Sequence, residues 1–268
     1  MEPKVRYAYA DTPLGQVHYR EAGSGPPVVL FHESPISGRI YEESLLVLGR
    51  RVRAIAPDTP GYGASPPPPE PIPITGYSER MILFLDALGL DKVALVGSHT
   101  GGAIAAQLAV DHQERVPAIV IVGSPLFDDD ERQDKLKNYL PPFKASPDGE
   151  HLSWLWARYQ RIWGKDSPAE LLHLATTEFL RTGSRYDWGY QAAFRFEADK
   201  IFPQVQCPTL FLATKGDLLR DKNEKSVELT PNANGRVTEN PYGQFPARDP
   251  EGFSREVLAF LSEVGYLT

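Results

Sequence analysis

Short apolar runs alternate with helical patterns along much of the chain. The apolar runs are rich in valine, isoleucine, leucine and alanine, and each is short enough to form one buried strand. They lie at residues 28–32, 52–58, 93–97, 118–122 and 209–213. Strands of this kind, separated by helices, predict a mostly parallel sheet with helices on both faces. The fold class expected from the pattern is therefore α/β.

Three segments between or after these strands carry apolar residues at helical spacing. Residues 77–88 form a broad apolar face and are followed by Gly89, a residue type at which helices commonly end. Residues 101–110 consist mainly of small side chains and come directly after a strand. The last segment, 250–261, repeats apolar residues every three or four positions. The first two segments can supply the crossover connections that parallel strands require.

One irregular segment, residues 65–73, holds six of the 25 prolines of the chain. This composition predicts a stiff surface loop of polyproline II type. A binding site for a proline-reading module is the alternative, and the rigid loop is the preferred interpretation.

The long connection at residues 125–206 separates two strands and contains half of the 28 aromatic residues, including all four tryptophans. Long connections in compact domains usually have a function. We expect this cap segment, residues 125–206, to be a helical insertion over a core formed by residues 1–124 and 207–268. Trp154, Trp156 and Trp188 are the candidates for lining a substrate pocket beneath it.

Composition narrows the range of partners. The 28 basic and 35 acidic residues give a net charge of −7, which argues against binding to nucleic acid or to an anionic membrane. The N-terminus shows no apolar signal region, and no stretch approaches about 20 apolar residues. We therefore expect a soluble cytoplasmic protein whose partner is a small-molecule substrate, with a homodimer left open.

Few residues are available for chemistry near neutral pH. The chain has one cysteine and six histidines, and no metal-ligand spacing is evident. Gly61-Tyr62-Gly63 follows a strand but lacks the rest of a dinucleotide-binding pattern. We expect no metal and no cofactor. Of the histidines, His18 is expected to face solvent.

The residues Gly97-Ser98-His99-Thr100-Gly101 stand between a predicted strand and a predicted helix. Small residues around one central side chain at such a turn are typical of a nucleophile elbow, which projects the central residue above the sheet. The central residue of this turn is His99.

With this turn, the chain resembles the α/β-hydrolase family over nearly its whole length. Five landmarks of the family occur in the expected order: His32-Glu33-Ser34-Pro35, Asp58-Thr59-Pro60-Gly61-Tyr62-Gly63-Ala64-Ser65, the turn at His99, Lys215-Gly216-Asp217, and Pro241-Tyr242-Gly243-Gln244-Phe245-Pro246. The resemblance implies an α/β-hydrolase fold with an inserted helical cap. It also implies that His32 braces the loop that follows it.

The chain departs from the family at its catalytic positions. His99 stands where the family has serine, cysteine or aspartate, and Gln244 stands where it has its histidine. Glu33 replaces the glycine of the oxyanion loop, and only the acid position is kept, as Asp217. The turn also resembles a less familiar branch of the family with His-Thr-Gly at the elbow. Ordinary serine-esterase chemistry is therefore not expected.

We hypothesise that His99 is the central catalytic residue and extends into the space that the family's histidine would fill. There it can meet Asp217, Glu33 or Gln244, and a carboxylate partner would make it a general base poised near neutral pH. The backbone N–H groups of Ser34 and Thr100 can form an oxyanion hole. Direct attack by His99 is a second route, and attack by Ser98 with His99 as its base is a third.

The function expected from these residues is hydrolysis of a small, largely apolar carbonyl substrate, such as an ester, a lactone or a compound with a cleavable C–C bond. A lyase or decarboxylase on the same scaffold is the alternative, as is a catalytically silent protein that binds a ligand. A carboxylate within hydrogen-bond reach of His99, beside a cavity, would favour an enzyme. A His99 packed without polar partners would favour the silent protein.

Overall fold

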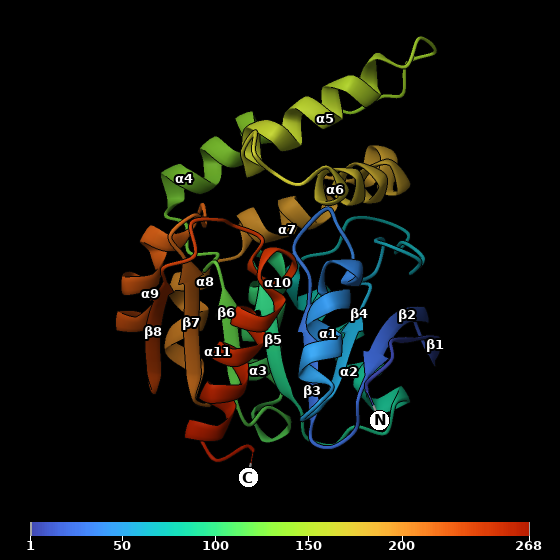
Figure 1. Ribbon diagram of the computed structural model, residues 1–268. Coiled ribbons are helices and arrows are strands. Elements are labelled where there is room, and N and C mark those ends of the chain that lie inside the picture. Colours follow the sequence, from blue (N-terminus) through green and yellow to red (C-terminus); the bar gives the residue numbers. More distant parts are fainter. Residues whose placement is uncertain (1, 268) are drawn as a thin grey trace.

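The computed structural model describes residues 2–267, and its centre is one twisted sheet of eight strands in the order β1-β2-β4-β3-β5-β6-β7-β8 (Figure 1). The strands β3 to β8 run parallel to one another, whereas β1 and β2 form an antiparallel hairpin that joins β4. The strands are β1 (Arg6–Thr12), β2 (Gly15–Ala22), β3 (Pro27–Phe31), β4 (Arg53–Pro57), β5 (Ala94–Ser98), β6 (Ile119–Val122), β7 (Thr209–Thr214) and β8 (Ala233–Thr238).

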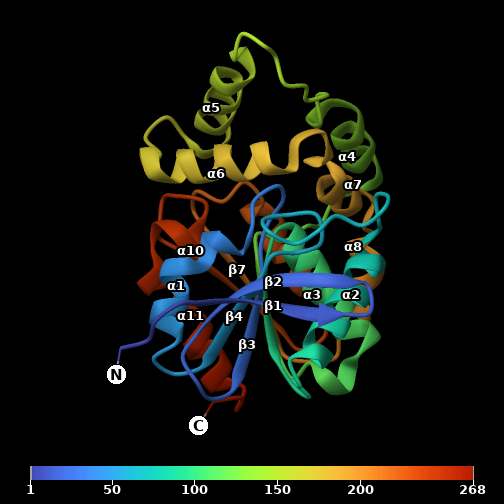
Figure 2. The same cartoon turned by 90° about the vertical axis from the view of Figure 1, so that its right-hand side faces the viewer.

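Helices cover both faces of the sheet, which explains why its central strands are apolar throughout. One face packs on α2 (Ile74–Ala87), α3 (Thr100–Asp111) and α9 (Asn223–Leu229), and the other on α1 (Glu42–Leu48) and α11 (Pro250–Glu263) (Figure 2). In β3, Val29 and Phe31 join the first hydrophobic cluster, whereas Val28 and Leu30 join the second. A strand buried on both sides has no polar alternation.

The cap segment is helical and lies above the ends of the parallel strands (Figures 1 and 2). Its helices are α4 (Asp129–Asp134), the short π-helical turn η3 (Lys135–Tyr139), α5 (Glu150–Trp163), α6 (Ala169–Thr182), α7 (Trp188–Arg195) and α8 (Ala198–Ile201). The last of these descends beside the sheet, where Ala198 and Phe202 join the hydrophobic cluster around α3. The remaining helices form a layer above the sheet, with α5 packed against α6.

The predicted strands and helices are present within about three residues of their expected ends. The pattern missed three strands. Two of them, β1 and β8, are edge strands with largely exposed residues and therefore no apolar run. The third, β2, is largely buried but carries polar and charged side chains among its apolar ones. The proline-rich segment 65–73 is an irregular loop, as predicted. Across residues 2–267, no helix combines the length and apolarity that a membrane crossing needs.

A buried network of hydrogen bonds and ion pairs centres on Asp58, the first residue of the second landmark segment. Oδ1 of the fully buried Asp58 accepts hydrogen bonds from Arg20 at 2.6 Å and from the backbone N–H of Gly38 at 2.9 Å. Its Oδ2 accepts the backbone N–H of Ala64 at 2.9 Å and lies 2.8 Å from Nδ1 of His18. His18 is therefore buried rather than solvent-facing, because β1 covers it and Asp58 supplies its partner.

Candidate active site

The turn between β5 and α3 places His99 at the carboxyl end of the central strand. His99 has φ 48° and ψ −108°, a backbone conformation that side-chain-bearing residues rarely adopt. A Cβ at Gly97 would lie 2.2 Å from the carbonyl oxygen of Gly101, and one at Gly101 would lie 2.0 Å from that of Phe31. Only glycine fits at these two positions, so the sequence predicted the sharp turn correctly.

Two carboxylates hold the His99 ring. Its Nδ1 lies 3.2 Å from Oε2 of Glu33, and its Nε2 lies 3.1 Å from Oδ2 of Asp217. Asp217 is fixed in turn, because its other oxygen accepts the backbone N–H of Leu219 at 2.7 Å. A Cβ at Gly123 would lie 2.3 Å from the ring, so this glycine makes room for the contact. The structure thus brings together three of the predicted site residues.

The carboxylates make the His99 ring a cation at neutral pH. Burial opposes the charged ring, but the nearby charges of Asp217 and Glu33 outweigh it and raise the pKa of His99 to about 9. Burial alone would raise the pKa of Asp217, yet the charge and hydrogen bond of His99 bring that pKa below its usual value. For Glu33, burial wins over the attraction of His99, and the pKa of its carboxyl is raised.

This charge state differs from that of a base poised near neutral pH. The expectation of such a base assumed one carboxylate partner, whereas the ring has one on each nitrogen. At pH 7 a ring with a pKa near 9 is neutral in about one molecule in a hundred. Nε2 is hydrogen-bonded to Asp217 and Nδ1 is paired with Glu33, so the protonated ring offers no free lone pair for attack.

Gln244 and Ser98 lie beside this trio without bonding to His99. Gln244 and Ser98 line a small cavity together with Glu33, His99 and Asp217. Gln244 has φ 52°, and its buried Oε1 has no hydrogen-bond partner among residues 2–267.

The hydroxyl of Ser98 is bonded to Tyr41 instead. Its Oγ lies 2.8 Å from the hydroxyl of Tyr41, which donates to the carbonyl of Phe31 at 3.0 Å. This pairing argues against Ser98 as a nucleophile activated by His99.

Only one of the two predicted oxyanion-hole residues lines a cavity with His99. Thr100 does so, and its backbone N–H opens α3. Ser34 is buried elsewhere, with its hydroxyl close to Gly189 and Tyr62. Within residues 2–267, neither Ser34 N–H nor Thr100 N–H donates to a backbone carbonyl.

The loop that carries Glu33 is braced by His32. Nδ1 of His32 donates to the carbonyl of Glu33 at 2.9 Å, and Nε2 accepts the backbone N–H of Thr59 at 2.9 Å. Burial lowers the pKa of His32 to about 4, so the ring is neutral and can accept this hydrogen bond. His32 is thus a support for the loop, as expected.

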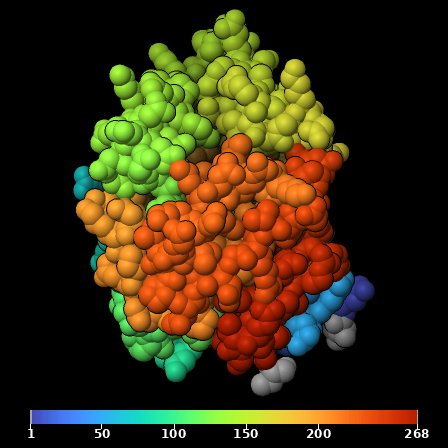
Figure 3. Space-filling model, turned by 90° about the vertical axis from the view of Figure 1, so that its left-hand side faces the viewer, coloured from blue at the N-terminus to red at the C-terminus, as the bar shows by residue number. Residues whose placement is uncertain are grey.

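An apolar cavity of about 320 Å³ opens beside His99 under the cap segment. In Figure 3 the surface is hollowed where green residues of the cap segment meet orange residues that follow β7. The cavity is lined by His99, Thr100, Pro125, Phe127, Lys135, Tyr139, Tyr190, Ala193, Phe194, Leu218 and Leu219. Sequence reasoning missed the four aromatic residues, although Tyr190 and Phe194 are one helical turn apart.

The three tryptophans predicted to line the pocket lie elsewhere. Trp154 is 36% exposed and packs near Phe143 and Phe179. Trp156 packs against the cluster around α1 and α11, and Trp188 begins α7 without lining the cavity. The prediction of a tryptophan-lined pocket is therefore wrong, because α5 packs its aromatic residues against α6 rather than over His99.

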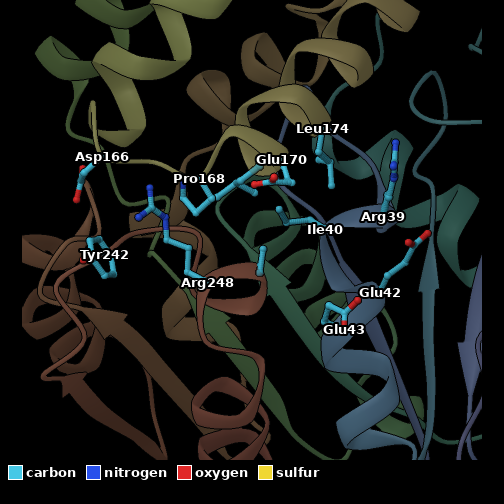
Figure 4. A pocket seen from close by; sticks show the side chains of 12 residues that line it. Arg39, Ile40, Glu42, Glu43, Asp166, Pro168, Glu170, Leu174, Tyr242 and Arg248 are labelled. Carbon is cyan, nitrogen blue, oxygen red and sulfur yellow. The ribbon is translucent and has the colours of Figure 1, made fainter.

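A second groove, of about 470 Å³, lies between α1, α6 and α10 (Phe245–Arg248). Figure 4 shows the charged side chains Arg39, Glu170 and Arg248 around it. It contains none of the predicted site residues. In residues 2–267 no three histidine, cysteine, aspartate or glutamate side chains form a group that could hold a metal ion.

Comparisons with known proteins agree with this architecture. The family described as "alpha/beta hydrolase fold" matches residues 26–151. Haloalkane dehalogenase 2 of Mycobacterium tuberculosis is 34% identical over 112 residues, which are 41% of this chain and 39% of the relative. The putative carbamate hydrolase RutD of Caulobacter sp. is 26% identical over 92% of this chain and 94% of its own length.

Among solved structures, the enol-lactonase from Burkholderia xenovorans LB400 superposes with a TM-score of 0.79. The match covers 95% of this chain and 100% of the enol-lactonase at 17% sequence identity. The likeness concerns the fold.

Proposed function

We propose that this chain, which has the α/β-hydrolase fold, is a cofactor-independent hydrolase of a small, largely apolar ester or lactone. The reaction centre is the trio His99, Glu33 and Asp217, in place of a serine, histidine and aspartate. The observation that carries the proposal is the position of His99: it stands at the elbow, bonded to two carboxylates, at the wall of an apolar cavity. A protein that only binds a ligand does not need a strained backbone at His99 or two carboxylates beside its ring.

In this proposal Glu33 is the general base and His99 acts as a cation. Glu33 has a raised pKa from burial, which makes its carboxylate a better proton acceptor than an exposed one. The His99 imidazolium keeps that carboxylate in place and lies close to where negative charge develops on the substrate. Asp217 fixes the ring and balances its charge.

The proposed reaction has two steps. Glu33 takes a proton from a water molecule whose oxygen attacks the carbonyl carbon, and the carbonyl oxygen becomes an oxyanion. The His99 cation and the Thr100 N–H stabilise this oxyanion. The oxyanion then reforms the carbonyl and the C–O bond to the leaving group breaks. The proton on Glu33 passes to that group, so the products are a carboxylic acid and an alcohol.

The relatives support the reaction class. The dehalogenase and the putative carbamate hydrolase have hydrolytic names, and the superposed structure is a lactonase. Because the match spans only 39% of the length of the dehalogenase, the substrate is inferred from the cavity and not from that relative. The four aromatic side chains of the cavity fit a compact apolar acyl group.

Turnover of a substrate panel tests the proposal. The panel contains short aryl and alkyl esters, lactones, β-diketones and hydroxy-ketones, with acid release followed by a pH indicator. We expect the wild-type protein to hydrolyse esters or lactones, and E33Q to lower kcat/KM by about 10²-fold or more. The matched control E114Q changes an exposed glutamate in the turn that follows α3, far from His99 at the start of that helix, and should leave the rate unchanged.

Two outcomes would contradict the proposal. Equal turnover by E33Q and the wild-type protein would remove Glu33 from the chemistry. Cleavage of the hydroxy-ketones or β-diketones without hydrolysis of any ester or lactone would favour a lyase on the same scaffold.

A further inference from the structure

Lys135 presents a cation to the cavity that holds His99. It begins the π-helical turn η3, is half-buried, and lines the cavity. Its Nζ lies 4.9 Å from the ring centroid of Phe127, 5.5 Å from that of Tyr139 and 5.6 Å from that of Phe194. The salt bridges formed within residues 2–267 do not include Lys135. Aromatic faces hold this ammonium, and no carboxylate neutralises it.

A second cation stands behind the same aromatic wall. Arg158 on α5 is 6% exposed, and its guanidinium carbon lies 5.4 Å from the ring centroid of Tyr139 and 5.7 Å from that of Trp154. Its Nη2 is buried without a hydrogen-bond partner among residues 2–267. The salt bridges formed within residues 2–267 do not include Arg158, so its charge adds positive potential on this side of the cavity.

The two cations meet at Tyr139, at the cap side of the cavity, whereas His99 lines it at the sheet side. Glu33 and Asp217 contact His99 from the small cavity beside it. The cavity therefore has a positive end and a reaction-centre end, with aromatic walls between them. A ligand that satisfies both ends has an apolar body, a carbonyl group facing His99 and a negative charge facing Lys135.

We propose that the substrate of this chain carries a carboxylate, and that Lys135 is the residue that selects it. The orientation of the substrate rests on the proposed hydrolase function, whereas the recognition of a carboxylate does not. Arg158 contributes positive potential through the Tyr139 wall and does not touch the ligand. The substrate class is thus a small ester or lactone that bears a free carboxylate.

Binding of two matched probes tests this inference without turnover. The probes are 3-phenylpropanoate and its neutral amide, 3-phenylpropanamide, titrated into the whole protein by calorimetry. We expect the wild-type protein to bind the carboxylate about tenfold more tightly than the amide, and added NaCl to reduce that preference. K135M keeps the length and apolar stem of the side chain, and should lose the preference while binding the amide as before.

The control K137M removes an exposed lysine from the same short turn and should keep the preference. Equal binding of the two probes by the wild-type protein, or an undiminished preference in K135M, would mean that Lys135 only packs on the aromatic rings. Absence of binding by both probes at millimolar concentration would also overturn the inference. A carboxylate preference without ester turnover would instead refute the proposed hydrolase and leave this inference standing.

Discussion

Replacing His99 by alanine is expected to lower kcat/KM for ester or lactone hydrolysis on the order of a thousandfold. The variant removes the cation that holds Glu33 and that faces the developing oxyanion. It also leaves Glu33 and Asp217 near each other without the charge that separates them. Initial rates at pH 7 for the wild-type protein, H99A and H99Q measure the effect, and H99Q keeps much of the side-chain volume.

The matched control lies at the other end of the same helix. His112 follows the last residue of α3, where its backbone N–H bonds to Leu108, and H112A should retain the full rate. Circular dichroism checks that each variant is folded. Imidazole added to H99A should restore part of the rate, because it can supply the missing cation. A rate for H99A equal to that of the wild-type protein would remove His99 from the reaction.

The substitution D58N is expected to destabilise the fold by about 3–5 kcal/mol, the usual cost of breaking a buried ion pair. Asp58 lies 2.6 Å from Arg20 and its side chain is fully buried, whereas Glu42, which lies 2.9 Å from Arg20, is partly exposed. The amide of asparagine cannot neutralise the guanidinium. Urea unfolding at pH 7 measures the loss in free energy of unfolding. The loss should appear as a lower midpoint concentration of urea with an unchanged slope, because the two proteins expose the same surface area on unfolding.

The effect of Asp58 depends on pH in a defined direction. Burial disfavours its charge, but the His18 hydrogen bond, the Arg20 charge and the Ala64 N–H outweigh burial and lower its pKa to about 2. A carboxyl with a lowered pKa stabilises the fold above its unfolded value near 4, and this stabilisation is lost as the pH falls towards 2. The difference between wild-type protein and D58N should therefore be constant from pH 5 to 7 and shrink below pH 4.

Asp86 provides the control for Asp58. It pairs with Arg115 at 2.7 Å on the surface, with 52% of its side chain exposed, so D86N should cost less than about 1 kcal/mol. A D58N protein as stable as D86N would show that the buried network contributes nothing to the fold.

The fold could be predicted from the sequence because its strands are buried on both faces. Such strands are uninterrupted apolar runs, and the glycines around His99 reveal the elbow between one of them and its helix. The α/β-hydrolase fold expected from these features is confirmed. Edge strand β8 left no such signal, because its side chains are mostly exposed.

The site could be predicted only in part, because its contacts join distant residues. The pairing of His99 with Asp217 followed from the family resemblance. The contact of Glu33 with the other ring nitrogen depends on the position of the loop that follows β3. The pocket required the packing of the cap helices, and residue type alone suggested tryptophans where the structure has Phe127, Tyr139 and Lys135. Aromatic composition cannot tell which residues form the core of a helical layer and which face a cavity.

Two carboxylates hold His99 as a charged group at the elbow. A long-range ¹H–¹⁵N NMR titration of the histidine rings tests this charge state most directly, with the His99 signals assigned from the spectrum of H99Q. We expect both ring nitrogens of His99 to stay protonated at pH 7 and the ring to titrate near pH 9. A neutral ring at pH 7, titrating near the ordinary value of about 6.5, would contradict it.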